Sequence, residues 1–227
     1  MEHWLYSIVI AGHTLTFNLD TIFTMWFAMI VLIIVAIAAT RKLSLVPNKL
    51  QTVCEGIMSF FRGIMDAMNA DKKHVPLVAS LFLFILFANL MGQLPLRLIH
   101  LKTGELASPT NDINLTGAMA LIVLVYYVTT GIKQKGGRYF LHELTFNGII
   151  TALVEILEMV TRPLSLAIRL FANIFAGEIL VSIALGACAY FLPLPIMLFE
   201  LFVAFVQAAV FMMLTIAYIS SASGEEH

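Results

Sequence analysis

Long apolar runs alternate with short polar segments along most of this chain. Five runs carry few or no charged residues: 21–40, 75–96, 115–132, 147–190 and 196–219. About 20 helical residues cross a hydrocarbon layer about 30 Å thick, so each run predicts a membrane-crossing helix. Pro193 and Pro195 separate the last two runs, because proline ends a helix or starts a new one. We expect these two to form a long tilted hairpin.

Residues 47–70 follow a different pattern. Their apolar side chains recur at helical spacing and are interrupted by Lys49, Glu55, Arg62 and Asp66. An apolar stripe beside a charged face is typical of a helix that lies in the membrane surface. The sequence therefore predicts an in-plane amphipathic helix here, between the first and second crossings.

The composition agrees with a chain that is largely surrounded by lipid. Of 227 residues, 60% are hydrophobic and 12% are charged, against about 45–50% and about 25% in globular domains. This excludes a cytosolic enzyme, a secreted disulfide scaffold and a disordered segment, and the net charge of −1 excludes an overall basic nucleic-acid binder. Cys54 and Cys188 have no metal-type spacing, and no cofactor is expected. The prediction is an all-α integral membrane protein with one domain, residues 1–227.

The positions of Lys and Arg predict the orientation. One side would hold nine of the 13: Arg41, Lys42, Lys49, Arg62, Lys72, Lys73, Lys133, Lys135 and Arg138. The other side would hold only Arg97 and Lys102. Cytoplasmic loops carry the excess of positive charge, so we expect the N-terminus outside and the C-terminus in the cytoplasm.

The fourth crossing is unusually long and polar. From Glu155 to Tyr190 it has 36 residues, about 54 Å of helix at about 1.5 Å per residue, so it must tilt. At about 100° per residue, Glu155, Arg162, Arg169 and Asn173 share one side of this helix, with Glu158 and Ser165 beside them, while Glu178 lies opposite Arg169. In the last run, Glu200 and Gln207 share a face.

Two interpretations of these polar residues stay open. Glu155 and Glu158 either serve an ion path or lie near a membrane surface as partners of Arg162, and Glu200 either lines a path or is an interfacial carboxylate. Arg169 is harder to explain structurally, because a guanidinium cannot lose its charge by deprotonation and charges at membrane depth are costly. The sequence lacks the repeated arginines of a voltage sensor and histidines within its spans for haem. An ion-conducting subunit with a partner fits best, and a stand-alone channel or secondary transporter is the alternative.

Several segments resemble subunit a of F-type ATP synthases. The segment SLAIRLFANIFAGE at 165–178 is similar to that family's signature around its essential arginine. Similar stretches are Arg162-Pro163, QAAVFMMLTIAY at 207–218, NLMGQLP at 89–95 and PTNDIN at 109–114. The resemblance covers essentially the whole chain.

The resemblance implies a stator that lies beside a rotating ring of c subunits and takes part in ATP synthesis without catalysing it. Two offset aqueous half-channels would carry H⁺ or Na⁺ to and from the ring carboxyls. Arg169 would lie between the half-channels and keep each passing carboxyl ionised, while Asn173 would help to place Arg169 and Gln207 would face it. Other implied partners are the peripheral-stalk b subunits, the remaining ATP synthase subunits and the lipid bilayer.

The resemblance also assigns residues to each half-channel. Glu178 and Glu200 would line the outer one, with Asp112 and Asn114 near its mouth, and Glu155 would belong to the inner one. Relatives often have His where this chain has Glu178 or Glu200, so the paired carboxyls leave the coupling ion open. The Ala-Gly-Glu178 sequence favours a bacterial cell membrane over the mitochondrial inner membrane as the location.

Overall fold

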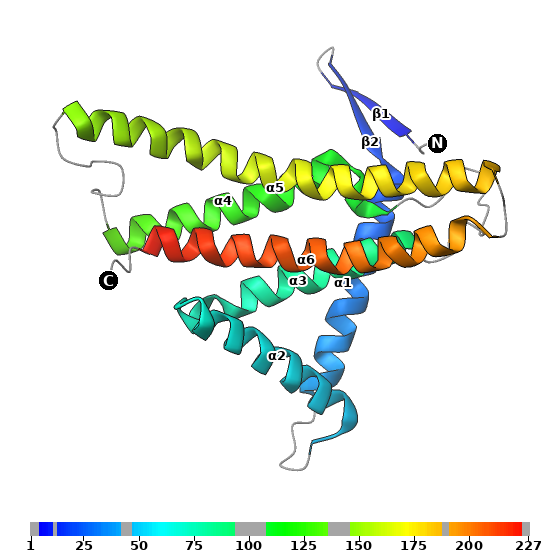
Figure 1. The fold of residues 1–227 in the computed structure, drawn as a ribbon, viewed down its shortest axis with the longest axis horizontal. Helices are drawn as coiled ribbons and strands as arrows, with labels where there is room; N and C mark the ends of the chain where they lie inside the picture. Colours follow the sequence, from blue (N-terminus) through cyan, green and yellow to red (C-terminus); the bar gives the residue numbers. More distant parts are fainter. Residues whose placement is uncertain are drawn as a thin grey trace.

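A computed structural model describes residues 5–10, 13–41, 47–93, 108–135, 146–187 and 191–223. This part of the chain is almost entirely helical, and five of its helices are long and apolar enough to cross a membrane (Figure 1). The predicted fold class, an all-α membrane protein, is therefore confirmed. The one addition is an N-terminal β-hairpin, which the apolar pattern did not indicate.

The elements follow one another in a simple order. The hairpin strands are β1 (Leu5–Ile10) and β2 (His13–Asn18), which pair antiparallel with Leu5 opposite Asn18. The long helices are α1 (Leu19–Thr40), α2 (Lys49–Ala67), α3 (Val75–Gln93), α4 (Ile113–Lys135), α5 (Phe146–Ala187) and α6 (Pro193–Ser223). Two short 3-10 turns, η1 (Lys72–His74) and η3 (Pro109–Asn111), precede α3 and α4.

Helix α6 begins earlier than the sequence analysis expected. Pro193 is its first residue, three positions before the expected start at residue 196, and Pro195 lies in its first turn. Proline is tolerated there because the first turn of a helix has no partners for its backbone N–H groups. The pair of prolines therefore marks the start of α6 and lies within it.

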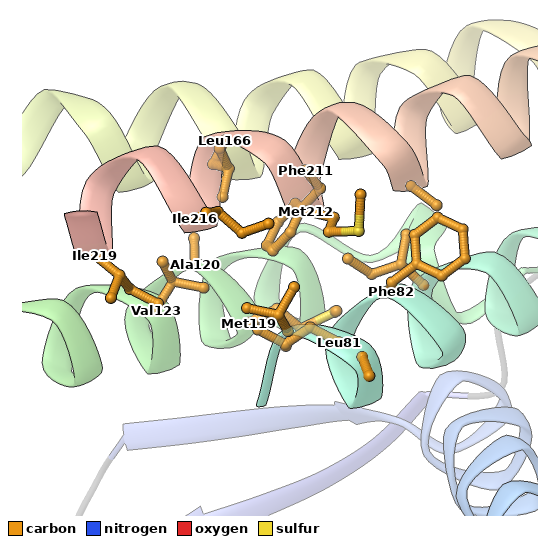
Figure 2. Close-up of a cluster of buried hydrophobic side chains, with 14 of the residues drawn as sticks. Leu81, Phe82, Met119, Ala120, Val123, Leu166, Phe211, Met212, Ile216 and Ile219 are labelled. Carbon is orange, nitrogen blue, oxygen red and sulfur yellow. The ribbon is translucent and has the colours of Figure 1, made fainter. Parts of the chain in front are cut away.

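The apolar core lies where α3, α4, α5 and α6 pack together (Figure 2). Its members come mainly from these four helices, with Phe61 and Met65 from α2; among them are Leu81, Phe82, Met119, Val123, Leu166, Phe211, Met212 and Ile216. By contrast, the share of α1 that is buried is small, and most of its apolar side chains face outward. This is the arrangement expected where lipid solvates the outer surface of a helical bundle.

Helix α2 is amphipathic, and the side chains of Gln51, Phe61 and Met65 are buried. The Phe61 ring packs edge-on against Phe82 of α3, with the ring centroids 5.4 Å apart. Lys49, Glu55, Arg62 and Asp66 are exposed along α2. The placement of α2 in the membrane surface remains a prediction.

The turn between α2 and α3 is held by polar contacts at its surface and below it. Asp71 caps η1 by accepting a hydrogen bond from the Lys73 backbone N–H at 3.2 Å. Hydrogen bonding to Lys73 holds the pKa of the exposed Asp71 carboxyl below its usual value. Next to it, the buried His74 ring contacts the Tyr126 hydroxyl of α4 through Nδ1 at 2.8 Å. These contacts fix the start of α3 against α4.

Helix α5 is the longest element of the fold. Its 42 residues correspond to about 63 Å at about 1.5 Å per residue, about twice the thickness of a hydrocarbon layer. In Figure 1, α5 runs antiparallel to α6, and the two helices are in contact. The hairpin expected from the sequence is thus present, while its tilt in the membrane remains a prediction.

Candidate functional site

Helix α5 has two different faces. Leu166, Leu170, Ile174 and Val181 are buried against the neighbouring helices. Glu178 is on this inward face as well, with only 4% of its surface exposed. Arg169 is exposed on the other side of the helix.

Two hydrogen-bond donors hold the Glu178 carboxyl on η3. The Ser108 backbone N–H donates to Oε1 at 3.3 Å, and the Asn111 side-chain amide donates to Oε2 at 2.5 Å. Asn111 Oδ1 is buried too and accepts no hydrogen bond from the described residues. A buried carboxylate needs such partners, because burying an unpaired charge is very costly. The chain itself therefore provides the surroundings of Glu178.

A line of polar side chains continues from η3 into α3. Ser108 Oγ contacts Thr110 Oγ1 at 2.8 Å and the Ala88 carbonyl at 3.0 Å, and Thr110 Oγ1 contacts Asn89 Oδ1 at 2.8 Å. Ser108 and Thr110 each have one hydroxyl proton, and three contacts share these two protons. More than one arrangement of the protons is therefore possible. All three polar side chains are buried.

Gly92 allows η3 to come this close to α3. A Cβ atom on Gly92 would lie 2.6 Å from Ser108 Cβ, which is too close for any larger residue without a shift of η3. The absence of a side chain at residue 92 therefore permits the buried position of Ser108.

Asp112 connects the hairpin to α4. Its Oδ2 accepts a hydrogen bond from the Asn18 side chain at 2.6 Å, and its Oδ1 accepts from the backbone and side-chain nitrogens of Asn114 at 2.8 and 2.9 Å. The two sequence candidates Asp112 and Asn114 are thus in direct contact. Asn111, the residue before Asp112, donates a hydrogen bond to Glu178, so Asp112 and Asn114 lie near Glu178 as well.

The outward face of α5 leads from Arg169 to a pocket between α5 and α6. Arg169 has no hydrogen-bond or ion-pair partner among the described residues. One turn further, the half-buried Asn173 lines a pocket of about 180 Å³ with Gly177 and Leu180 of α5 and Phe199 and Glu200 of α6. At helical spacing, residues 169, 173, 176, 177 and 180 follow one side of α5.

Glu200 reaches across to α5 at Gly177. A Cβ atom on Gly177 would lie only 2.0 Å from Glu200 Oε1, so the carboxyl group of Glu200 occupies the space that any other residue would fill. Glu178 is the next residue along α5. The two carboxyl groups predicted to line the same path therefore lie at neighbouring positions of α5, Glu178 on its inward face and Glu200 of α6 against Gly177 in the pocket.

The remaining candidates are less fully described. Arg162 forms an ion pair with Glu158 one turn earlier, and its guanidinium carbon lies 5.3 Å from the centre of the Tyr218 ring of α6. This pair supports the interpretation of Glu158 as a partner of Arg162. Gln207 is buried on α6, and no hydrogen bond joins it to Arg169 in the described part of the chain. Glu155 lies on α5, but its side chain is outside the described part.

The sequence analysis missed several residues of this site. Asn89, Ser108, Thr110, Asn111 and Gly177 were not assigned roles, although each contacts a candidate residue or the line of polar side chains that leads to one. The signal was present in part, since Asn89 is a polar residue within an apolar run and Pro109 to Asp112 is a polar cluster. Only the packing of η3 on α3 and α5 brings them together.

The chain was compared with known proteins. A family described as ATP synthase A chain matches residues 22–220. The chain belongs to this family. It is also 44% identical over 211 residues to ATP synthase subunit a of Gloeobacter violaceus, over 92% of this chain and 85% of that protein.

Membership defines the general role of the chain. It is a multi-pass, membrane-sector subunit of a bacterial ATP synthase, it does not itself catalyse ATP chemistry, and its partners are other subunits of that complex. This favours the complex subunit over the stand-alone channel or transporter. Within the described residues, no group of three or more His, Cys, Asp or Glu side chains could hold a metal ion.

Proposed function

We propose that this chain is the ion-translocating stator of its ATP synthase. Two aqueous half-channels carry H⁺ or Na⁺ to and from a rotating c-subunit ring, and Arg169 separates them. The fixed positive charge ionises each ring carboxyl that passes, because an opposite charge at short range favours the charged form of the acid. It also blocks direct passage of cations between the half-channels.

The exposed side chain of Arg169, which has no ion-pair partner within the described part of the chain, carries this proposal. A charged group near the middle of a bilayer costs about 2.5–3.5 kcal/mol on insertion scales, and a guanidinium stays charged. The described residues offer it no acidic partner. A carboxyl group on another subunit would complete the ion pair.

The helix surface around Arg169 suits a close neighbour. Ser165, Ala172 and Ala176 are exposed on this side of α5 and are all small. Small residues allow the backbones of two membrane helices to approach closely. A ring helix could therefore bring a carboxyl near the guanidinium of Arg169.

The outer half-channel would use the two carboxylates beside Gly177. Asp112 and Asn114 would lie near its mouth, and Asn111 and Ser108 hold Glu178 on the inward face of α5. Glu200 and Asn173 line the pocket that continues toward Arg169. Together they form a series of polar groups from η3 to the Arg169 face. The inner half-channel would run along the Glu155 side of α5, and Gln207 would face Arg169 from α6.

The orientation follows from the distribution of Lys and Arg, with the N-terminus outside and the C-terminus in the cytoplasm of a bacterial cell. The c ring and the peripheral-stalk b subunits are the proposed contacts within the complex. Co-purification with both would support this, whereas recovery of the chain alone or as a homo-oligomer would favour a stand-alone transporter.

Arg169→Ala tests the central claim. We expect the complex to assemble, and ATP synthesis driven by an ion gradient to be lost in inverted vesicles. The matched control is Arg162→Ala, which removes an arginine from the same helix but one whose charge is paired with Glu158. The control should keep measurable synthesis. Normal synthesis in Arg169→Ala would disprove the role.

The coupling ion requires a separate experiment. ATP synthesis in vesicles is measured with a pH gradient alone and then with a sodium gradient alone. Synthesis under only one of the two gradients identifies the ion, and synthesis under neither would contradict the stator function.

A further inference from the structure

We propose that Tyr127 of α4 is a positioning residue for α5, because its hydroxyl group replaces a backbone hydrogen bond that Pro163 removes. Along α5, the replaced bond lies between Glu158 and Arg169. The functional part of this inference rests on the proposed role of Arg169, while the structural part can be tested separately.

Pro163 lies inside α5 and has no N–H group to donate to the carbonyl four residues earlier. That carbonyl belongs to Met159. The Tyr127 hydroxyl donates to the Met159 oxygen at 3.2 Å. In a membrane, backbone groups freed by proline must find partners from neighbouring helices, since lipid offers none. The structure thus shows which side chain takes this role.

Tyr127 is firmly placed for this contact. Its side chain is buried, with 2% of its surface exposed, and its ring lies 6.1 Å from the Tyr218 ring of α6. Tyr218 in turn carries the Arg162 guanidinium over its face. Side chains of α4, α5 and α6 therefore meet at the single turn of α5 that contains Pro163.

The position of this turn gives the contact its functional meaning. Helices bend most easily where proline interrupts their hydrogen bonds. Arg169 lies six residues after Pro163, and Glu158 lies five residues before it. The geometry at Pro163 therefore sets how the side of α5 with Arg169 is oriented relative to the part of α5 that contains Glu158. The Tyr127 hydroxyl holds this geometry in one arrangement.

A double-mutant cycle tests the inference in the assembled complex. Tyr127→Phe removes the hydroxyl, and Pro163→Ala restores the backbone N–H that can donate to Met159. Hydrogen exchange of the 157–169 segment is measured with ATP-driven ion pumping. Tyr127→Phe should raise exchange and lower pumping by about two- to tenfold, the effect of losing one hydrogen bond. In the double variant, both should return to the level of Pro163→Ala alone.

The adjacent tyrosine provides a matched control. Tyr126→Phe also removes one hydroxyl group from α4, but that hydroxyl contacts His74 and not α5. Pro163→Ala should therefore leave any effect of Tyr126→Phe unchanged. Rescue of Tyr126→Phe by Pro163→Ala would show a general effect of removing the proline and would overturn the inference.

Other outcomes are equally decisive. Additive effects of the two substitutions, or unchanged exchange in Tyr127→Phe, would refute the replaced hydrogen bond. A change in exchange without a change in pumping would refute the positioning role. If Tyr127→Phe fails to assemble, recovery of assembly by Pro163→Ala supports the inference and continued failure contradicts it. Failure of the stator proposal itself would appear in Arg169→Ala, whatever this cycle shows.

Discussion

Arg169 and Glu178 lie nine residues apart on α5, and their surroundings are opposite. Glu178 is buried, and its carboxyl group accepts hydrogen bonds from Ser108 and Asn111 of η3. Arg169 is exposed and has no polar partner among the described residues. Both are ionisable side chains on a helix predicted to cross a membrane, so each needs compensation there.

The difference shows which part of the site the chain completes by itself. On the inward face of α5, donors from Ser108 and Asn111 of the same chain meet the acceptor oxygens of Glu178. The outward face presents a permanent cation between small residues. On our proposal, that half of the site is completed by another subunit of the complex. Substitutions on the two faces should therefore fail in different ways.

After Arg169→Ala, the largest effect is expected when the carboxyl groups of Glu178 and Glu200 are both removed. Glu178→Gln removes the carboxyl group on the inward face, and Glu200→Gln removes the one in the pocket. The double variant should slow ion flux by about a hundredfold, because a positioned proton-transferring group commonly contributes a rate factor of this size. Ion flux through the membrane sector in vesicles measures this. Glu55→Gln, at an exposed position of α2, is the control and should keep the parental rate. An unchanged rate in the double variant would remove both residues from the ion path.

A smaller effect is expected where the two faces meet. Gly177→Ala places a methyl group in the space of the Glu200 carboxyl, which must turn away from α5. Because a flexible side chain can move, the thermal stability of the complex should hardly change, while flux should fall by about tenfold because a misplaced group works poorly.

The control for this change is Gly186→Ala, which adds the same methyl group to α5 where nothing lies within 4 Å. It should leave the flux unaffected. Equal effects of the two alanine substitutions would show that the space beside Glu200 is unimportant.

The smallest effect is expected from loosening the inward face. Asn111→Ala removes the side-chain amide that donates to Glu178 Oε2 and leaves the Ser108 N–H in place. The loss of one hydrogen bond predicts a drop in flux of about fivefold. Asn48→Ala removes an exposed asparagine whose side chain caps no helix and should have no effect. A loss as large as that of the Glu178→Gln/Glu200→Gln double variant would contradict this small effect and would show that the Asn111 hydrogen bond is essential for the position of the Glu178 carboxyl.

The fold was largely predictable because membrane crossing is a property of local composition. Within the described residues, each long apolar run is helical, as α1 at Leu19–Thr40 and α3 at Val75–Gln93 show. The strands at Leu5–Ile10 and His13–Asn18 were missed, because the prediction relied on long apolar runs, whereas the alternation of polar and apolar residues in HTLTFN at 13–18 is a short signal. The start of α6 was placed three residues late, because two prolines were read as a break and not as the first turn.

Residue chemistry alone indicated site candidates only where a charged side chain in lipid is costly by itself, and the family resemblance supplied the other candidates. Arg169 and Glu178 are charged residues in an apolar segment, and helical spacing alone puts them on opposite sides of α5. Asn111 and Ser108 are ordinary polar residues of a connecting segment, and nothing in their spacing indicates that they meet Glu178. Their role depends on how η3 packs between α3 and α5, over a separation of 67–70 residues.

The sequence by itself determined the membrane class, the five long apolar helices and the position of Arg169 within one of them, because the cost of placing a side chain in lipid depends on that side chain and its near neighbours. Tertiary structure decided which polar groups meet: Asn111 with Glu178, Glu200 with Gly177, and Tyr127 with the carbonyl that Pro163 leaves free. Such contacts need two helices at a specific distance and rotation, and packing across the whole bundle sets both.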